Sequence, residues 1–249
     1  MIAIRQPQEI AKLQASGRIL RELWDALKPA VVGGTATAEL DELAARFIAE
    51  RGGTPTFKGY RGYPAALCIS INDEVVHGIP RPDRQLKDGD LVGIDVGVTL
   101  DGYIADAARS LVVGGSPGPE ALKLVATARQ ALDRAIEQSR PGNRIKDLSR
   151  AIQETAEAAG YTVVRQLCGH GVGTSLHEAP EIPNFVKAGP SATLRPGMVL
   201  AIEPMVNAGA WQVRFLPDGW TVVTEDGSLS AHFEDTVVVT EDQPLVTTR

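Results

Sequence analysis

The sequence predicts an α+β fold in which antiparallel strands occupy the centre and helices lie outside them. Apolar residues occur both at helical spacing and in strand-like runs, and the order of two helices followed by strands occurs twice. A ten-residue block is also repeated, because Leu86–Asp95 aligns without gaps to Leu194–Glu203 and both copies end on an acid. We therefore expect one domain over residues 1–249, built from two related halves, about 1–115 and 116–249, around a pseudo-twofold axis.

Two helix patterns open the first half. Apolar residues at helical spacing run from Ile10 to Leu27, and a second apolar face runs from Leu40 to Ile48. The glycine-rich stretch GGTPTFKGYRGYP that follows indicates a loop. Strands are then predicted at Leu67–Ile71, Leu91–Val98 and Tyr103–Val113.

The second half repeats this order. Helices are predicted near Glu120–Gln138 and Ile145–Ala159. Acids again match between the halves, since Asp106 precedes the apolar run that starts at Ala107 much as Glu234 precedes the run that starts at Asp235. Strands are predicted near Tyr161–Gln166, Met198–Val206, Trp220–Val223 and Ala231–Val239.

Composition narrows the functional class. Of the 249 residues 43% are hydrophobic and 22% charged, as in soluble globular enzymes, and no apolar run reaches the roughly 20 residues of a membrane helix. The net charge of −6 without a basic block makes nucleic acid a poor candidate for the main partner. The first twenty residues lack a signal-peptide pattern and two cysteines cannot form a disulfide scaffold, so we expect a cytoplasmic protein.

Strand alternation predicts where the matched acids point. Val92, Ile94 and Val96 share one face, so Asp95 lies on the other, beside glycines that leave space around its carboxylate. Glu203 likewise points away from the helix side of its strand. A lone acid on a half-exposed strand is the commoner case, but two acids at matched positions favour a shared site.

The four histidines of the chain support this interpretation. His170 lies in the glycine-rich CGHGVG, with His177 seven residues later. His77 precedes a glycine, and His232 lies two residues before Glu234 on the same strand face. A single histidine is more often structural than functional, but here each lies beside a glycine or an acid.

Charge balance then favours a metal-dependent hydrolase. Four carboxylates that converge in one cavity would repel one another, and two divalent cations would neutralise them. Oxygen ligands with one imidazole suit Mn, Fe, Co or Zn, and a pair of such ions makes a nucleophilic hydroxide available near neutral pH. Neither a zincin helix, a phosphate-binding loop nor a serine-nucleophile elbow is present in the sequence.

Over essentially its whole length the sequence resembles type I methionine aminopeptidases, which have the pita-bread fold. Each matching stretch is short, but together, in order and at compatible spacing, they are specific. The stretches are CISINDEVVHGIP (68–80), GDLVGID (89–95), Asp101–Asp106, CGHGVGTSLHEAP (168–180), AIEPMVNAG (201–209) and SLSAHFEDT (228–236).

The resemblance implies a mechanism and roles for particular residues. It implies that hydroxide bound to a dinuclear metal centre attacks the carbonyl of an N-terminal methionine. Glu203 would move the proton, His177 would hydrogen-bond the developing oxyanion, and His77 would contact the scissile amide. The implied metal ligands are Asp95, Asp106, His170, Glu203 and Glu234, with Asp106 and Glu234 bridging. The implied methionine pocket comprises Tyr60, Tyr63, Cys68, Leu176, Met205 and Trp220, although core packing explains each of these six equally well.

The resemblance also implies a substrate class and partners. The family acts on nascent chains whose second residue is small, which makes the ribosome a candidate partner, and we expect a monomer. The sequence departs from the family pattern at Val76, at Ala105 and Ala107-Ala108, at His232 and at Asp235. None of these is a predicted metal ligand, and we hypothesise that His232 orients a ligand or the bound substrate.

Two alternatives remain. A proline-specific peptidase of the same fold usually carries a substantial N-terminal domain, for which the segment before Leu67 is too short. A non-catalytic binding module built on this fold typically lacks the metal ligands, whereas all five positions are filled here.

Overall fold

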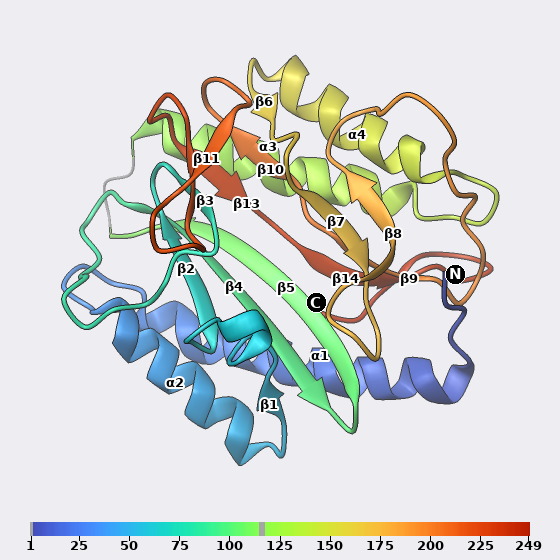
Figure 1. Ribbon diagram of the computed structural model, residues 1–249, viewed down its shortest axis with the longest axis horizontal. Helices are drawn as coiled ribbons and strands as arrows, with labels where there is room; N and C mark the ends of the chain where they lie inside the picture. Colours follow the sequence, from blue (N-terminus) through green and yellow to red (C-terminus); the bar gives the residue numbers. More distant parts are fainter. Residues whose placement is uncertain (1, 115–117) are drawn as a thin grey trace.

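A computed structural model of the protein describes residues 2–114 and 118–249 and shows helices on two opposite sides of a group of strands (Figure 1). In these ranges no helix combines the length and apolar character that a membrane crossing requires. The helices are α1 (Pro7–Leu27), α2 (Thr37–Glu50), α3 (Pro119–Glu137) and α4 (Ile145–Ala158), with short 3-10 turns η1 (Lys28–Ala30) and η2 (Tyr60–Gly62).

Five strands belong to the first half and ten to the second, within the described residues. The first five are β1 (Thr54–Pro55), β2 (Leu67–Ile71), β3 (Glu74–Val76), β4 (Leu91–Leu100) and β5 (Tyr103–Val112). The others are β6 (Thr162–Val163), β7 (Cys168–Gly171), β8 (Glu178–Pro183), β9 (Val199–Ile202), β10 (Met205–Asn207), β11 (Val213–Phe215), β12 (Val222–Thr224), β13 (Ser230–His232), β14 (Asp235–Val238) and β15 (Leu245–Val246).

A long hairpin, β4–β5, forms the centre of the first half. Its two-residue turn is Asp101-Gly102, and both residues adopt positive φ, 49° and 78°, as a tight hairpin turn requires. Strands β1 and β2 pair antiparallel with β4, which completes a four-stranded sheet. The hairpin therefore holds its side chains in a fixed alternation over ten residue pairs.

A five-stranded sheet forms the centre of the second half, in the order β15-β14-β9-β7-β8. The four-stranded and five-stranded sheets meet at an antiparallel bridge between Ala108 of β5 and Glu234, with backbone N···O distances of 3.3 and 3.0 Å. Next to this bridge the hydroxyl of Thr236 bonds both the amide and the carbonyl of Asp106. A side chain thus replaces the backbone ladder there, and the expected central sheet is divided. Among the described residues, two three-stranded sheets, β13-β10-β6 and β11-β12-β3, accompany the four-stranded and five-stranded sheets.

Three strands predicted in the second half are shorter or interrupted in the structure. Met198–Val206 is not one strand, because it breaks into β9 and β10 at Glu203-Pro204, and Pro204 has no amide proton for a ladder. The strand predicted at Ala231–Val239 is interrupted at the same level and forms β13 and β14, with Glu234 in the gap between them. The Tyr161–Gln166 strand is reduced to β6.

The apolar core has two main parts, one for each half. Helices α1 and α2 pack on the first sheet through residues such as Leu23 and Ile94, and α3 and α4 pack on the second through residues such as Leu132 and Leu200. Burial of each such side chain contributes about 1.5–3 kcal/mol. The faces turned away from the helices meet between the halves, which is where the acids lie.

The relation between the halves remains a prediction. In the first half Asp106 pairs with Gly97, which lies two residues beyond Asp95 on β4. In the second half Asp235 pairs with Ile202, and these two residues directly adjoin Glu234 and Glu203. The matched acids are therefore offset differently across the two strand pairs.

Candidate metal centre

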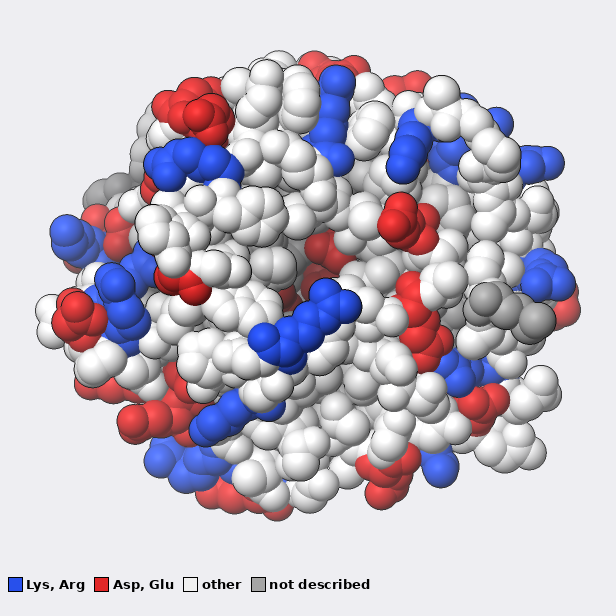
Figure 2. All heavy atoms as spheres, in the orientation of Figure 1, with Lys and Arg blue, Asp and Glu red and all other residues white. Residues whose placement is uncertain are grey.

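A cavity of about 220 Å³ lies between the two halves. Figure 2 shows acidic atoms at the bottom of a hollow near the middle of this face. All five predicted metal ligands line the cavity, and we refer to them as the cluster: Asp95, Asp106, His170, Glu203 and Glu234.

Strand pairing determines the direction of Asp95, the first acid of the cluster. Asp95 on β4 lies between Cys68 of β2 and Ala108 of β5, and its neighbours Ile94 and Val96 pack against the helices. Since alternate residues point to opposite faces, Asp95 is directed away from the helices and towards the second half. The predicted direction of Asp95 is therefore confirmed.

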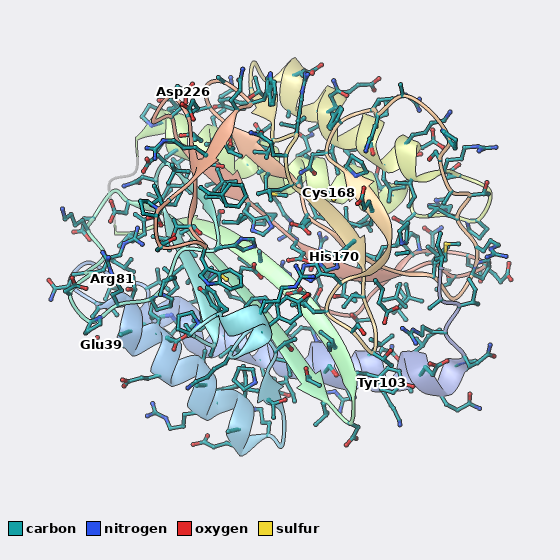
Figure 3. The ribbon with its side chains drawn as sticks, in the orientation of Figure 1. Glu39, Arg81, Tyr103, Cys168, His170 and Asp226 are labelled. Atoms are coloured by element: carbon teal, nitrogen blue, oxygen red, sulfur yellow. The ribbon has the colours of Figure 1, made fainter. Side chains whose placement is uncertain are left out.

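His170 reaches the cluster from β7, near the centre of the molecule (Figure 3). Its flanking glycines are required by close packing, because a Cβ at Gly169 would lie 2.5 Å from the carbonyl oxygen of Ala201. The Nδ1 of His170 lies 2.9 Å from the carbonyl oxygen of Gly171. That oxygen can only accept, so Nδ1 carries the proton and the Nε2 lone pair is free to bind a metal.

The ligand atoms of the cluster are close together. One ligand atom each from Asp106, His170 and Glu234 lie within 4.8 Å of one another. The Nε2 of His170 is 3.5 Å from Oε1 of Glu203, and the Nε2 of His232 is 3.8 Å from Oε2 of Glu203.

Burial dominates the electrostatics of the cluster. It raises the pKa of Asp106 to about 7, and together with the neighbouring carboxylates it raises the pKa values of Asp95, Glu203 and Glu234 well above their ordinary values. Burial also lowers the pKa of His170 to about 4, so its imidazole is neutral at pH 7.

The residues of the cluster fit divalent metal ions. Asp95 Oδ1, Asp106 Oδ1 and Glu234 Oε1 are buried without a hydrogen-bond partner among the described residues. A buried carboxylate oxygen without a partner costs free energy, and a cation bound between these oxygens would remove that cost. Hard oxygen donors with one imidazole suit Mn, Fe, Co or Zn.

Seven more of the predicted site residues line the same cavity: Tyr60, Tyr63, Cys68, His77, Leu176, His177 and Trp220. The Tyr60 hydroxyl is 2.7 Å from Nδ1 of His177. The ring of Trp220 meets that of Tyr63 edge-on at a centroid distance of 5.0 Å. Burial lowers the pKa of His77 to about 4, and burial with the charge of Arg61 lowers the pKa of His177.

Met205 is not among the residues that line the cavity. It is fully buried in a separate apolar cluster with Val76, Val164 and Val222. The strand break at Pro204 carries β10 away from β9 and towards β13 and β6, and Met205 follows that backbone into the core. Of the predicted pocket residues, Met205 thus takes the core-packing role.

The structure adds lining residues that the sequence patterns did not single out. Phe57 and Arg61 come from the glycine-rich loop, Leu167 lies directly before β7, and Cys168 is the first residue of β7. Loops have no periodicity to interpret, so closeness to Tyr60 and His170 in the sequence was the available signal. Burial raises the pKa of Cys168 to about 11, which leaves its thiol protonated and unsuited to nucleophilic attack.

Comparison with known proteins gives full-length matches. The sequence matches metallopeptidase family M24 over residues 11–241. It is 48% identical to a methionine aminopeptidase of Clostridium perfringens over 248 residues, covering 100% of this chain and 99% of that protein. Methionine aminopeptidase 1 of Bacillus subtilis is 44% identical over 97% of this chain and 96% of its own length.

Solved structures agree with these matches. A methionine aminopeptidase of Thermotoga maritima superposes with a TM-score of 0.97 at 42% identity, and 100% of each chain is covered. A prolidase of Pyrococcus furiosus gives a TM-score of 0.80 at 25% identity, and the match covers 99% of this chain but 65% of that one. These likenesses confirm the predicted α+β pita-bread fold.

Proposed function

The chain belongs to metallopeptidase family M24, and we propose that it is a type I methionine aminopeptidase that removes N-terminal methionine from nascent proteins and peptides whose second residue is small. The observation that carries this proposal is a buried cluster of four carboxylates and one neutral histidine in a cavity of about 220 Å³. The high full-length identity to methionine aminopeptidases favours this substrate over the proline peptides of the prolidase branch.

Divalent metal ions are the cofactor of this activity. The residues that would hold them are Asp95, Asp106, His170, Glu203 and Glu234. Bound divalent ions supply Lewis acidity and an activated water near neutral pH. The hydrogen bond from His170 Nδ1 to Gly171 keeps the imidazole in the tautomer that binds a metal through Nε2.

Glu203 is proposed to accept a proton from the attacking water and then to give it to the leaving amine. Burial, together with the charges of Asp95 and Asp106, raises its pKa, which brings proton transfer closer to neutral pH than for an exposed glutamate. Its position directly before Pro204, outside the strand ladder, leaves its carboxylate at the cavity surface.

His177 and His77 are proposed to bind the scissile amide. When the Tyr60 hydroxyl donates to Nδ1 of His177, Nε2 carries the proton and can donate it in a hydrogen bond to the substrate carbonyl oxygen. His77 is held in a left-handed backbone conformation, φ 61°, next to Gly78, and its lowered pKa keeps it neutral. The methionine side chain would lie among Tyr60, Tyr63, Cys68, Leu176 and Trp220.

A direct assay tests this proposal. The protein loaded with Mn or Co is incubated with Met-Ala-Ser and, separately, with an Ala-Pro peptide, and the released amino acid is quantified. We expect methionine from the first peptide and no alanine from the second, and we expect Glu203→Gln to release neither. Release of alanine with methionine retained would establish the proline-specific alternative, and no hydrolysis with no metal uptake would establish a binding module.

Location and assembly are part of the proposal. We expect a cytoplasmic monomer that meets its substrates as they emerge from the ribosome. Light scattering would test the monomer, and co-sedimentation with purified ribosomes would test the association.

A further inference from the structure

Arg61 introduces a positive charge into the lining of the cavity. Among the described residues that line it, Arg61 is the one lysine or arginine, and its side chain is exposed. Figure 2 shows basic atoms beside the central hollow. Arg61 lies in η2 with a positive φ of 49°, between Gly59 and Gly62, which also adopt positive φ. This tight turn presents the residue at the edge of the cavity.

The guanidinium of Arg61 has free hydrogen-bonding capacity. Within residues 2–114 and 118–249 it forms no ion pair and no side-chain hydrogen bond. It lies over the ring of Tyr60, whose centroid is 5.4 Å from Cζ. A guanidinium has five N–H donors in a planar fork that matches a carboxylate, so Arg61 can receive an acidic group.

Arg61 also lies on the side of the cavity where the substrate chain would continue. Tyr60, its neighbour, is hydrogen-bonded to His177, and the positive charge of Arg61 helps to lower the pKa of His177. If His177 binds the scissile carbonyl, the residues after the cleaved bond pass this side of the cavity. The four cluster carboxylates carry −4 when ionised, which two divalent ions would cancel, so Arg61 carries the remaining formal side-chain charge among the described residues that line the cavity.

We propose that Arg61 is a specificity residue that binds a carboxylate on the third residue of the substrate, so that peptides with Asp or Glu there are preferred over their amide counterparts. This inference rests on the proposed aminopeptidase function. Because the contact lies beyond the reacting bond, it is equally strong in the ground state and the transition state. It should therefore lower KM and leave kcat unchanged.

Four amidated peptides test the inference: Met-Ala-Asp-Gly, Met-Ala-Asn-Gly, Met-Ala-Lys-Gly and Met-Ala-Ser-Gly. At low salt we expect kcat/KM for the Asp peptide to exceed that for the Asn peptide by about two- to fivefold, the range of an exposed ion pair. The preference should shrink at 0.5 M NaCl, because the screening length is then well under 10 Å. Arg61→Gln should abolish the preference, Arg61→Glu should reverse it, and Arg61→Lys should retain part of it.

Lys58→Gln is the matched control. Lys58 lies in the same loop and is exposed, but it does not line the cavity. It should leave the Asp/Asn ratio unchanged.

An equal Asp/Asn ratio in the wild type and in Arg61→Gln, with all four peptides cleaved, would overturn the role of Arg61 and leave the aminopeptidase function standing. A similar loss of the ratio in Lys58→Gln would overturn it too, since the effect would then be general to the charge of the loop. If the metal-loaded wild type cleaves none of the peptides, the proposed function and this inference both fail.

Discussion

Removing the metal should make the stability of the protein fall as pH rises above 7. Burial raises the pKa values of Asp95, Glu203 and Glu234 well above the ordinary range, whereas the unfolded chain ionises these groups below pH 5. When the pKa of a carboxyl group is higher in the folded than in the unfolded protein, its contribution to the free energy of unfolding is fully present below the unfolded pKa. That contribution is lost as pH rises through the folded pKa. Each carboxyl protonated only in the folded state therefore lowers the free energy of unfolding by about 1.4 kcal/mol per pH unit.

The other shifted groups act mainly at lower pH. The pKa of Asp106 is raised to about 7, so its loss of stability is nearly complete by pH 8. The histidines have the opposite sign: burial lowers the pKa of His77 and His170 to about 4 and that of His232 to about 3, and their contribution is lost as pH falls from 6.5 towards these values. Between pH 7 and 8.5 the decline comes mainly from the carboxyl groups, at about 2 kcal/mol for each one still protonated, because the raised pKa of the Cys168 thiol begins to lower stability only near the ordinary thiol pKa of about 8.5.

Bound metal should remove this decline. Metal binding requires ionised carboxylates, so the affinity rises with pH, and a free metal concentration 100 times the Kd adds about 2.7 kcal/mol per site. Urea unfolding, followed by tryptophan fluorescence at pH 7.0 and 8.5 in EDTA or in MnCl₂, measures both effects. The exposed-acid variant Glu50→Gln should show the same slope as the wild type. Equal curves in EDTA and Mn, or a metal-free protein that gains stability over this range, would refute the reasoning.

Three further outcomes concern single side chains. Glu203→Gln should lower kcat for Met-Ala-Ser by 100-fold or more, because general acid–base catalysis contributes about 10²–10⁴, while circular dichroism stays unchanged; a loss below tenfold would remove Glu203 from proton transfer. Asp235 is fully buried and lies 2.6 Å from each of two arginines, so Asp235→Asn should lower the free energy of unfolding, measured in urea, by about 3–5 kcal/mol. The control Asp242→Asn, at an exposed position, should lower it by under 0.5 kcal/mol, and equal losses would contradict this. Tyr60→Phe removes the hydroxyl 2.7 Å from His177 and should lower kcat by about two- to tenfold in steady-state assays without changing the melting temperature; an unchanged kcat would argue against the orienting role.

Local patterns predicted the elements of the first half well. The alternation of Val92, Ile94, Val96 and Val98 placed these side chains against the helices, and all four are buried there with α1 and α2. The Asp-Gly turn after Leu100 is also encoded locally. Such features depend on neighbours a few residues apart, which is why one sequence is enough to find them.

The rest of the site depends on contacts that no local pattern contains. Arg61 has an ordinary loop sequence around it, and its place at the cavity follows from the packing of η2 beside His177, more than a hundred residues away in the chain. Met205 fits the alternation of a continuous strand, so its diversion into the core becomes visible only with the break at Pro204.

The same break explains why two of the acids reach the cavity. The β9–β14 ladder ends where Ile202 pairs with Asp235, and the β10–β13 ladder begins where Met205 pairs with His232. Glu203 and Glu234 lie in the gap between these ladders, and the backbone of Glu234 bonds Ala108 of the other sheet instead. Because Pro204 cannot donate to a ladder, a continuous strand pair at this level would lose hydrogen bonds in any case. The interruption therefore costs little, and it turns the second half towards Asp95 and Asp106 at the one level where both sheets supply carboxylates.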